Sequence, residues 1–277
     1  MFRWGVLFII VIASLAIGNQ WVNDQFIERV YSVSTTKISQ PVRIALLTDL
    51  HQTRYGERSE MLVAAIERSA PDLVVFGGGM TDLRAEPVVF CNLLDQLGER
   101  FPLAFVAGNH EVWTEQLVEI KEMVKAHGGM VLDGVCVSLE LREQKMTLCG
   151  LDDPVVGLQR YKTQLEKVLS SERSPEDFSL MISHRPEWRR IKLFVEAGFD
   201  LILSGHTHGG QIRIPGLLNG LFAPNQGLFP KISGGEYFHQ QTVQIVSRGL
   251  TRDSFGFPRI FNQPELVIID LKPQENF

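Results

Sequence analysis

The sequence is poor in cysteine: its 277 residues include only Cys91, Cys136 and Cys149, and no two of them form a Cys-x-x-Cys pair. An odd set at such wide spacing argues against a zinc knuckle and against a disulfide framework. We therefore expect the three cysteines to be small, buried, apolar side chains.

Basic charge is also scarce, because 27 Lys and Arg residues face 32 Asp and Glu residues and the net charge is −5. A nucleic-acid-binding protein usually shows a basic stripe or patch. We expect no nucleic-acid partner, and we expect any bound phosphate to be neutralised by metal and a few local cations. Internal repeats and low-complexity runs are absent from the sequence.

One stretch lacks charge altogether: residues 4–22 contain no Asp, Glu, Lys or Arg. About 20 such residues span a bilayer as a helix. A membrane anchor is the expected role of residues 1–22. A cleaved signal peptide with a site at Ser14-Leu15-Ala16 is the alternative, and a buried core helix is disfavoured because nothing amphipathic appears. Arg3 alone favours an N-terminus on the inside.

Behind a polar connector at residues 23–40, residues 41–277 alternate between short apolar runs and segments with helical spacing. A length of 277 residues suits one large domain or two small ones. The first strands are expected at 42–48, 73–76 and 103–106, with helices at 58–69, 87–97 and 115–126. This βαβαβα order predicts a parallel sheet with crossover helices.

The second half indicates another sheet, with short strands expected at 130–132, 136–141, 146–148, 180–182, 201–203, 243–246 and 266–269. Helices are expected at 159–169 and 187–197. Two sheets flanked by helices predict a four-layer α/β/β/α sandwich.

Five of the seven histidines fall in four short clusters: Asp49-Leu50-His51, Gly108-Asn109-His110-Glu111, Ser183-His184, and Gly205-His206-Thr207-His208-Gly209-Gly210. Apolar runs lead into these clusters, and ligands in α/β sheets bind beyond the carboxyl ends of strands. Oxygen and imidazole ligands suit Mn, Fe, Zn, Ni or Co. Each cluster alone has an ordinary structural explanation: a hydrogen-bonded pair, a turn that opens a helix, or a buried imidazole. All four at strand ends predict one metal site.

The order of these clusters resembles the calcineurin-like metallophosphoesterase superfamily, from about Val42 to the C-terminus. Gly205–Gln211 and the tail segment Ser247-Arg248-Gly249-Leu250 resemble its membrane-associated bacterial branch, which includes UDP-2,3-diacylglucosamine hydrolases of lipid A synthesis. The resemblance implies two divalent metal ions, Mn above all, and a place at the bacterial inner membrane, on a face that the sequence does not specify.

The resemblance also assigns roles to individual residues. It implies that Asp49, His51 and His208 hold the first metal and that Asn109, His184 and His206 hold the second. It makes His110 the general acid that protonates the leaving oxygen. It suggests Glu111 as an orienting group and Arg248 as a phosphate contact, for which a surface ion pair is the equal alternative.

One element of the family pattern is missing. The family places an aspartate that bridges the two metals after a glycine at the end of its second strand, where this chain has Gly79. Asp82 lies three residues later, and a register change would be needed for it to substitute. We expect weakened affinity for at least one metal and weak turnover. Restoring aspartate at position 79 should then raise the rate at least roughly a hundredfold.

The segment 214–230 is unusually apolar for a Gly- and Pro-rich loop, with Leu217, Leu218, Leu221, Phe222, Leu228 and Phe229. A loop packed on the core is one interpretation, and a lip for acyl chains or a bilayer is the other. The leading hypothesis is a membrane-associated phosphodiesterase or pyrophosphatase with a lipid-linked phosphate substrate such as UDP-2,3-diacylglucosamine. The alternatives are a catalytically degenerate binding or regulatory protein and an exported phosphoesterase of small organic phosphates.

Overall fold

The structure is a computed structural model, and it describes residues 18–19, 22–83, 86–254 and 257–274. The expected anchor at 1–22 falls almost wholly outside these ranges. Within them, no helix combines the length and the apolar character needed to cross a membrane.

Two six-stranded mixed sheets form the centre of the fold. The order of the first is β1-β16-β2-β3-β4-β5, with the bounds Ile27–Thr35, Glu265–Pro273, Val42–Leu47, Leu73–Phe76, Leu103–Phe105 and Met130–Val131. The order of the second is β12-β13-β9-β8-β7-β6, with the bounds Gly235–His239, Thr242–Val246, Leu201–Ser204, Phe178–Ser183, Gln144–Leu151 and Val135–Leu141. Parallel pairing joins β2, β3, β4 and β5 in one sheet, and β7, β8, β9 and β13 in the other.

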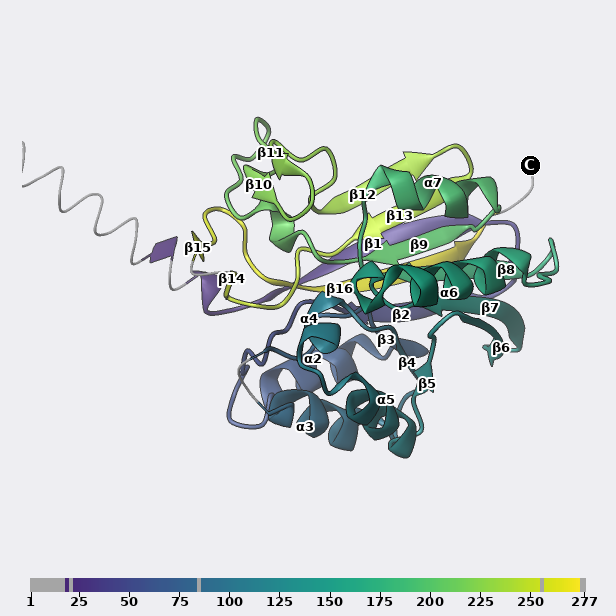
Figure 1. The fold of residues 1–277 in the computed structure, drawn as a ribbon, viewed down its shortest axis with the longest axis horizontal. Coiled ribbons are helices and arrows are strands. Elements are labelled where there is room, and N and C mark those ends of the chain that lie inside the picture. Colours follow the sequence, from purple (N-terminus) through teal and green to yellow (C-terminus); the bar gives the residue numbers. More distant parts are fainter. Residues whose placement is uncertain (1–17, 20–21, 84–85, 255–256, 275–277) are drawn as a thin grey trace, which may run out of the picture.

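Side chains alternate across these strands, and they divide the core into three apolar layers. Ala45 and Leu47 of β2 face α2, α3 and α5, whereas Ile44 and Leu46 face the second sheet. Met181 of β8 faces α6 and α7. The helices that cover the sheets are α2 (Glu60–Ser69), α3 (Val88–Leu97), α5 (Leu117–Ala126), α6 (Leu158–Ser170) and α7 (Trp188–Glu196). The layers therefore follow the expected α/β/β/α order (Figure 1).

The expected connector at 23–40 differs from the structure, which places β1 there in parallel pairing with β16. β1 forms the edge of the first sheet, and its exposed and half-buried side chains alternate along most of its length. An edge strand that faces water carries many polar residues, so composition did not distinguish it from a linker.

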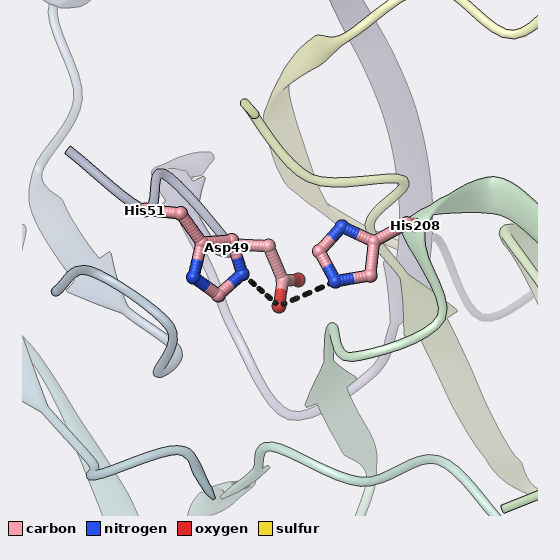
Figure 2. A group of neighbouring side chains, drawn as sticks. All are labelled: Asp49, His51 and His208. Carbon is pink, nitrogen blue, oxygen red and sulfur yellow. Dashed lines mark ion pairs between the residues drawn. The ribbon is translucent and has the colours of Figure 1, made fainter. Parts of the chain in front are cut away.

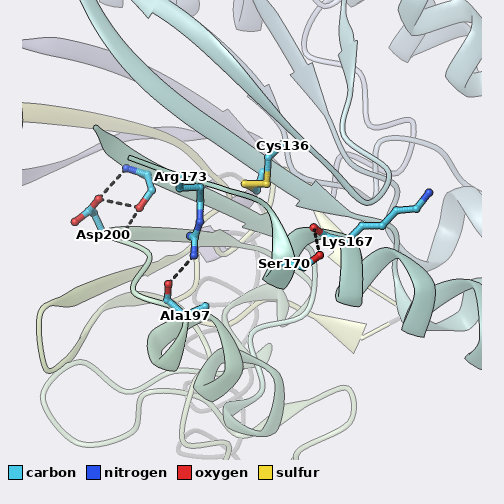
Figure 3. The surroundings of a disulfide bond; sticks show 8 residues. Cys136, Lys167, Ser170, Arg173, Ala197 and Asp200 are labelled. Carbon is cyan, nitrogen blue, oxygen red and sulfur yellow. Dashed lines mark hydrogen bonds between the residues drawn. A yellow bond between two sulfur atoms is a disulfide. The ribbon is translucent and has the colours of Figure 1, made fainter. Parts of the chain in front are cut away.

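The cysteines also differ from expectation, because Cys136 and Cys149 form a disulfide. The two residues are direct partners in the antiparallel hairpin of β6 and β7, with their Cα atoms 4.1 Å apart. Opposed residues on adjacent strands bring their Cβ atoms together, a pairing that sequence spacing does not reveal. Figure 3 shows the bond near the end of α6, where Lys167 and Ser170 lie. Cys91 is a free thiol.

Candidate metal centre

The predicted ligands all follow strands. They come together where the carboxyl ends of parallel strands from the two sheets meet. Asp49 and His51 follow β2, and Asn109 begins the short helix α4 (Asn109–Trp113) after β4. His184 follows β8, while His206 and His208 follow β9. Parallel strands direct their carboxyl ends to the same edge of a sheet, which explains how clusters far apart in sequence form one site.

Four of these residues have strained backbones. The φ angles of Asp49, His51, His206 and His208 are +50°, +45°, +72° and +48°. A side chain in this left-handed region costs about 1–2 kcal/mol. Such strain clusters at functional sites, where the surrounding structure holds it in place.

The first group of ligands surrounds one carboxylate oxygen. Asp49 Oδ1 lies 3.7 Å from His51 Nε2, 3.7 Å from His184 Nε2 and 3.8 Å from His208 Nε2. Figure 2 shows the Asp49 carboxylate between the rings of His51 and His208. Asp49 Oδ1 and His51 Nε2 are buried, and neither makes a hydrogen bond within the part of the chain that the structure describes.

The hydrogen bonds of the rings show which nitrogens carry lone pairs. His184 Nδ1 lies 2.8 Å from the Gly77 carbonyl and His51 Nδ1 lies 3.2 Å from the Thr81 carbonyl, so both Nδ1 atoms donate. In the neutral rings, the lone pairs of both Nε2 atoms then face the Asp49 oxygen. Metal-binding histidines are typically oriented by such a bond from the opposite nitrogen. Lone pairs that converge without a hydrogen fit a cation, and this chain's residues therefore fit a divalent metal.

The second group converges on an amide oxygen. Asn109 Oδ1 lies 3.0 Å from His184 Nε2 and 3.0 Å from His206 Nδ1. His206 Nε2 lies 2.7 Å from Asn225 Oδ1 and donates to it, which leaves Nδ1 as the lone-pair atom. His184 contacts both groups, so the two candidate metal positions are adjacent.

Asp153 is a further candidate ligand that the histidine clusters of the sequence did not indicate. Its carboxylate lies within 4.8 Å of ligand atoms of His184 and His206, and it is fully buried. Arg185 Nε and Nη2 donate to it at 2.6 and 2.8 Å. Asp153 follows β7 in the segment Leu151-Asp152-Asp153, and this position of carboxylates just after a strand was the signal available in the sequence.

The electrostatics of the site favour a charged carboxylate at Asp49 and neutral imidazoles at His206 and His208, whereas Asp49 raises the pKa of His51 against the effect of burial. Burial raises the pKa of Asp49, but His208, His184 and His51 together outweigh burial and hold the pKa well below its usual range. Burial lowers the pKa of His206 to about 4, with a further contribution from His184. The pKa of His208 is also well below its ordinary value, chiefly through burial. Neutral rings are the form that binds metal.

Gly79 lies beside this centre and has a φ of +70°. A Cβ atom added to Gly79 would lie 2.8 Å from Asp49 Oδ1 and 2.9 Å from Asp49 Cα. A side chain at this position would therefore point into the metal centre, but the loop must shift to admit it. Asp82 does not fill the gap, because its Oδ1 lies 3.6 Å from His110 Nδ1 and accepts a hydrogen bond from the Leu83 amide.

Glu111 is fully buried and holds the loop that carries Gly79. Its Oε2 accepts from the amides of Gly79 and Gly108 at 2.9 and 2.8 Å. Its Oε1 accepts from the amides of Met80 and Thr81 at 2.6 and 2.9 Å. Glu111 therefore orients the backbone around the metal centre.

His110 lies over His51, with the two ring centroids 4.0 Å apart. Burial and the neighbouring His51 lower the pKa of His110 to about 4, against the opposite effect of Glu111 and Asp82. The ring is therefore neutral near pH 7 in the metal-free protein. The predicted role as a general acid requires a bound anion to raise this pKa.

Arg248 lies apart from the predicted ligands. Its side chain lines a pocket with Arg29 and Arg213, and none of the predicted ligands lines that pocket. Arg248 Nε lies 3.4 Å from Glu265 Oε2, which agrees with the ion-pair alternative.

Comparison with known proteins agrees with this geometry. The family model of the calcineurin-like phosphoesterases matches residues 42–210. Phosphodiesterase YaeI of Escherichia coli is 31% identical over 238 residues, which cover 83% of this chain and 82% of YaeI. An uncharacterised metallophosphoesterase of Aquifex aeolicus is 26% identical over 257 residues, covering 89% of this chain and 92% of the relative.

An uncharacterised metallophosphoesterase of Campylobacter jejuni is 27% identical over 247 residues; the match covers 87% of this chain but only 62% of that longer relative. The matched family segment contains every predicted metal ligand, from Asp49 to His208. The chain therefore belongs to the calcineurin-like phosphoesterase family, and its class is that of the metallophosphoesterases, the hydrolases of phosphoric esters.

Proposed function

We propose that this protein hydrolyses a phosphodiester or pyrophosphate bond in a lipid-linked substrate, with UDP-2,3-diacylglucosamine as the candidate. The observation that supports a lipid is the attachment of an apolar loop to the metal centre. Asn225, between β10 (Phe222–Ala223) and β11 (Gly227–Leu228), accepts a hydrogen bond from His206. The loop is thereby tied to a residue that we propose as a metal ligand.

Apolar side chains of this loop face solvent. Leu228 is 67% exposed, Phe229 is 64% exposed and Phe222 is 46% exposed. In Figure 1 the β10–β11 hairpin projects from the body of the two sheets. Apolar side chains that remain exposed beside a polar site typically mark a binding surface. We infer that acyl chains lie against these residues while the phosphate group lies at the metals.

The residues would divide the chemistry as follows. Two divalent ions held by Asp49, His51 and His208 and by Asn109, His184 and His206 would neutralise the phosphoryl oxygens and activate the attacking water. The pKa of His110 is sensitive to nearby charge. A bound phosphate would raise this pKa, and Asp82, 3.6 Å away, would stabilise the protonated ring. His110 would then donate its proton to the leaving oxygen.

The lipid half of the proposal is tested with two exposed leucines. Leu228→Ser should raise the KM for UDP-2,3-diacylglucosamine by roughly tenfold or more, because burying a leucine side chain contributes about 1.5–3 kcal/mol. Hydrolysis of a soluble aryl phosphodiester should be unchanged. Leu158→Ser, on α6 and 70% exposed, is the matched control. Equal kinetics for both variants would exclude acyl contact at this loop.

The hydrolytic half is tested with His110→Ala. This variant should retain metal and lose turnover of substrates with poor leaving groups, whereas an activated aryl ester needs little proton donation and should be less affected. Equal losses on both kinds of ester would contradict the general-acid role.

The absence of a carboxylate at Gly79 favours a second candidate, a binding or regulatory protein on the same fold. Metal content by elemental analysis, compared between the wild type and Gly79→Asp, separates it from the enzyme.

For localisation we propose the bacterial inner membrane. The apolar sequence at 4–22 supports attachment. The Cys136–Cys149 disulfide supports the alternative of an exported phosphoesterase of small organic phosphates, because disulfides are rare in reducing compartments. Membrane fractionation and detergent dependence separate the lipid hydrolase from this exported alternative.

A further inference from the structure

An open pocket of about 580 Å³ lies beside the loop that follows the last histidine cluster. Three arginines line it: Arg29 from β1, Arg213 after β9, and Arg248 after β13. The rest of the lining comes from residues 214–219 and Phe261, and Asn219 is its one polar side chain.

Positive charge in this pocket exceeds negative charge. Glu265, whose side chain is fully buried, pairs with Arg29 Nε at 2.8 Å and with Arg248 Nε at 3.4 Å through the same oxygen. Its other oxygen accepts a hydrogen bond from the Arg248 amide at 3.0 Å. A single carboxylate is thus shared by two guanidinium groups.

Arg213 has no carboxylate partner within the ranges that the structure describes. Its Nη1 donates to the Gly209 carbonyl at 3.0 Å and its Nη2 donates to Asn219 Oδ1. Burial and the charge of Arg248 lower the pKa of Arg213 to about 10. The fully buried Arg259 donates to the Arg248 carbonyl at 2.8 Å, so a further cation lies next to Arg248. A bound anion would relieve the repulsion among these groups.

We propose that Arg29, Arg213 and Arg248 form a site for a phosphate group that is separate from the metal centre. Guanidinium groups present planar forks of N–H donors that match phosphate oxygens. The three come from three different segments of the chain and converge on one pocket, which allows several of them to contact one phosphate.

The apolar lining indicates where the phosphate comes from. Leu217 is 82% exposed and Phe261 is 68% exposed, and both line the pocket next to the arginines. Cationic groups beside exposed apolar side chains match the headgroup and the upper acyl region of an anionic phospholipid. A phospholipid headgroup is the expected source of the phosphate, and free phosphate is the other source of the same chemistry.

The site shares loops with the metal centre but can be tested without it. Arg213 binds the carbonyl of Gly209, the neighbour of His208, and Arg248 precedes Gly249, which packs against Asp49. Because divalent metals also bind phosphate, the experiment uses protein freed of metal by a chelator. The inference therefore does not depend on the proposed hydrolysis.

The first arm measures binding of inorganic phosphate to the metal-free protein by calorimetry. Arg213→Gln and Arg29→Gln should each raise the Kd by roughly tenfold or more, the change expected for loss of about 1.4 kcal/mol of binding free energy. Arg142→Gln removes an exposed arginine that pairs with Asp72 elsewhere and should leave the Kd unchanged. Arg29, at the pocket rim, serves as the second variant in case Arg213→Gln disturbs the Gly209 loop.

The second arm measures cosedimentation with phosphatidylcholine vesicles, with and without phosphatidylglycerol. Retention by the anionic vesicles alone, weakened by both Arg29→Gln and Leu217→Ser, supports the site with a lipid headgroup as its source. Loss of inorganic phosphate binding in the arginine variants without vesicle retention supports the site with free phosphate as its source. Phosphate affinity that is equal in the wild type, Arg29→Gln and Arg213→Gln overturns the proposal.

Discussion

Replacing Gly79 with aspartate adds a carboxylate at the position where the family carries the aspartate that bridges the two metals. The new side chain would point in a suitable direction, because a Cβ atom at position 79 would lie next to Asp49 Oδ1. That oxygen faces His51, His184 and His208. A bridging carboxylate there would offset the mutual repulsion of two cations.

Two effects, both destabilising, set the loss of stability in Gly79→Asp. A φ of +70° costs a non-glycine residue about 1–2 kcal/mol. The 2.8 Å approach of the new Cβ to Asp49 Oδ1 forces a further shift of the loop. We expect the free energy of unfolding of metal-free Gly79→Asp to fall by about 2 kcal/mol, a typical value for strain at a special backbone position.

This strain is present in every folded state of the enzyme, with or without metal and substrate, so it lowers stability but changes neither the metal affinity nor the rate at saturating metal. The rate on a phosphodiester should still rise roughly a hundredfold, equivalent to about 2.7 kcal/mol of transition-state stabilisation. Gly79→Ala is the matched control, because it carries the same Cβ without the carboxylate. It should lose the same stability and gain no activity.

The assays are chemical denaturation, metal content by elemental analysis, and steady-state hydrolysis at saturating metal. If Gly79→Asp binds two metals and remains inactive on every phosphoester, the protein is a binding protein. If the wild type already binds two metals and is fully active, another group such as Asp153 completes the site and the reasoning about Gly79 is refuted.

Four further outcomes are expected. His208→Ala should lose bound metal with little loss of stability, which elemental analysis and thermal unfolding check together; unchanged metal content would refute the ligand assignment. Glu111→Gln should lower the free energy of unfolding by about 3 kcal/mol in urea titrations, because the new amide group faces two backbone N–H donors and each unsatisfied donor costs about 1–3 kcal/mol. Cys136→Ser should cost about 3 kcal/mol through loss of a disulfide that spans 13 positions, and a reductant should then have no further effect on the variant. The metal-free protein should lose stability as pH falls from about 6.5 to 4. The pKa of His206 is lowered to about 4 in the folded protein, so over this range the unfolded chain binds a proton that the folded protein does not. A His206→Gln variant whose stability falls equally steeply with pH would contradict this cause.

Periodicity predicted the layered fold because the strands of the two sheets are mostly buried on both faces. Runs such as Val42–Leu47 and Phe178–Ser183 are mostly apolar and mostly buried, and helices such as α2 and α5 bury one apolar face. β1 was not predicted, because the side chains on its solvent-facing side are polar. Its partner β16 also lies more than 200 residues away in the sequence.

The sequence by itself also singled out the candidate metal ligands, because ligands at strand ends keep a short local pattern of Gly, Asp, Asn and His. Only the tertiary structure decided how these clusters combine: that His184 contacts both groups, that Asp153 joins the second, and that Glu111 holds the loop at Gly79. The Cys136–Cys149 bond and the convergence of Arg29, Arg213 and Arg248 were likewise decided in space. The physical reason is that a strand period fixes where a side chain points, whereas the identity of its neighbours depends on strand order and sheet packing, which local sequence does not encode.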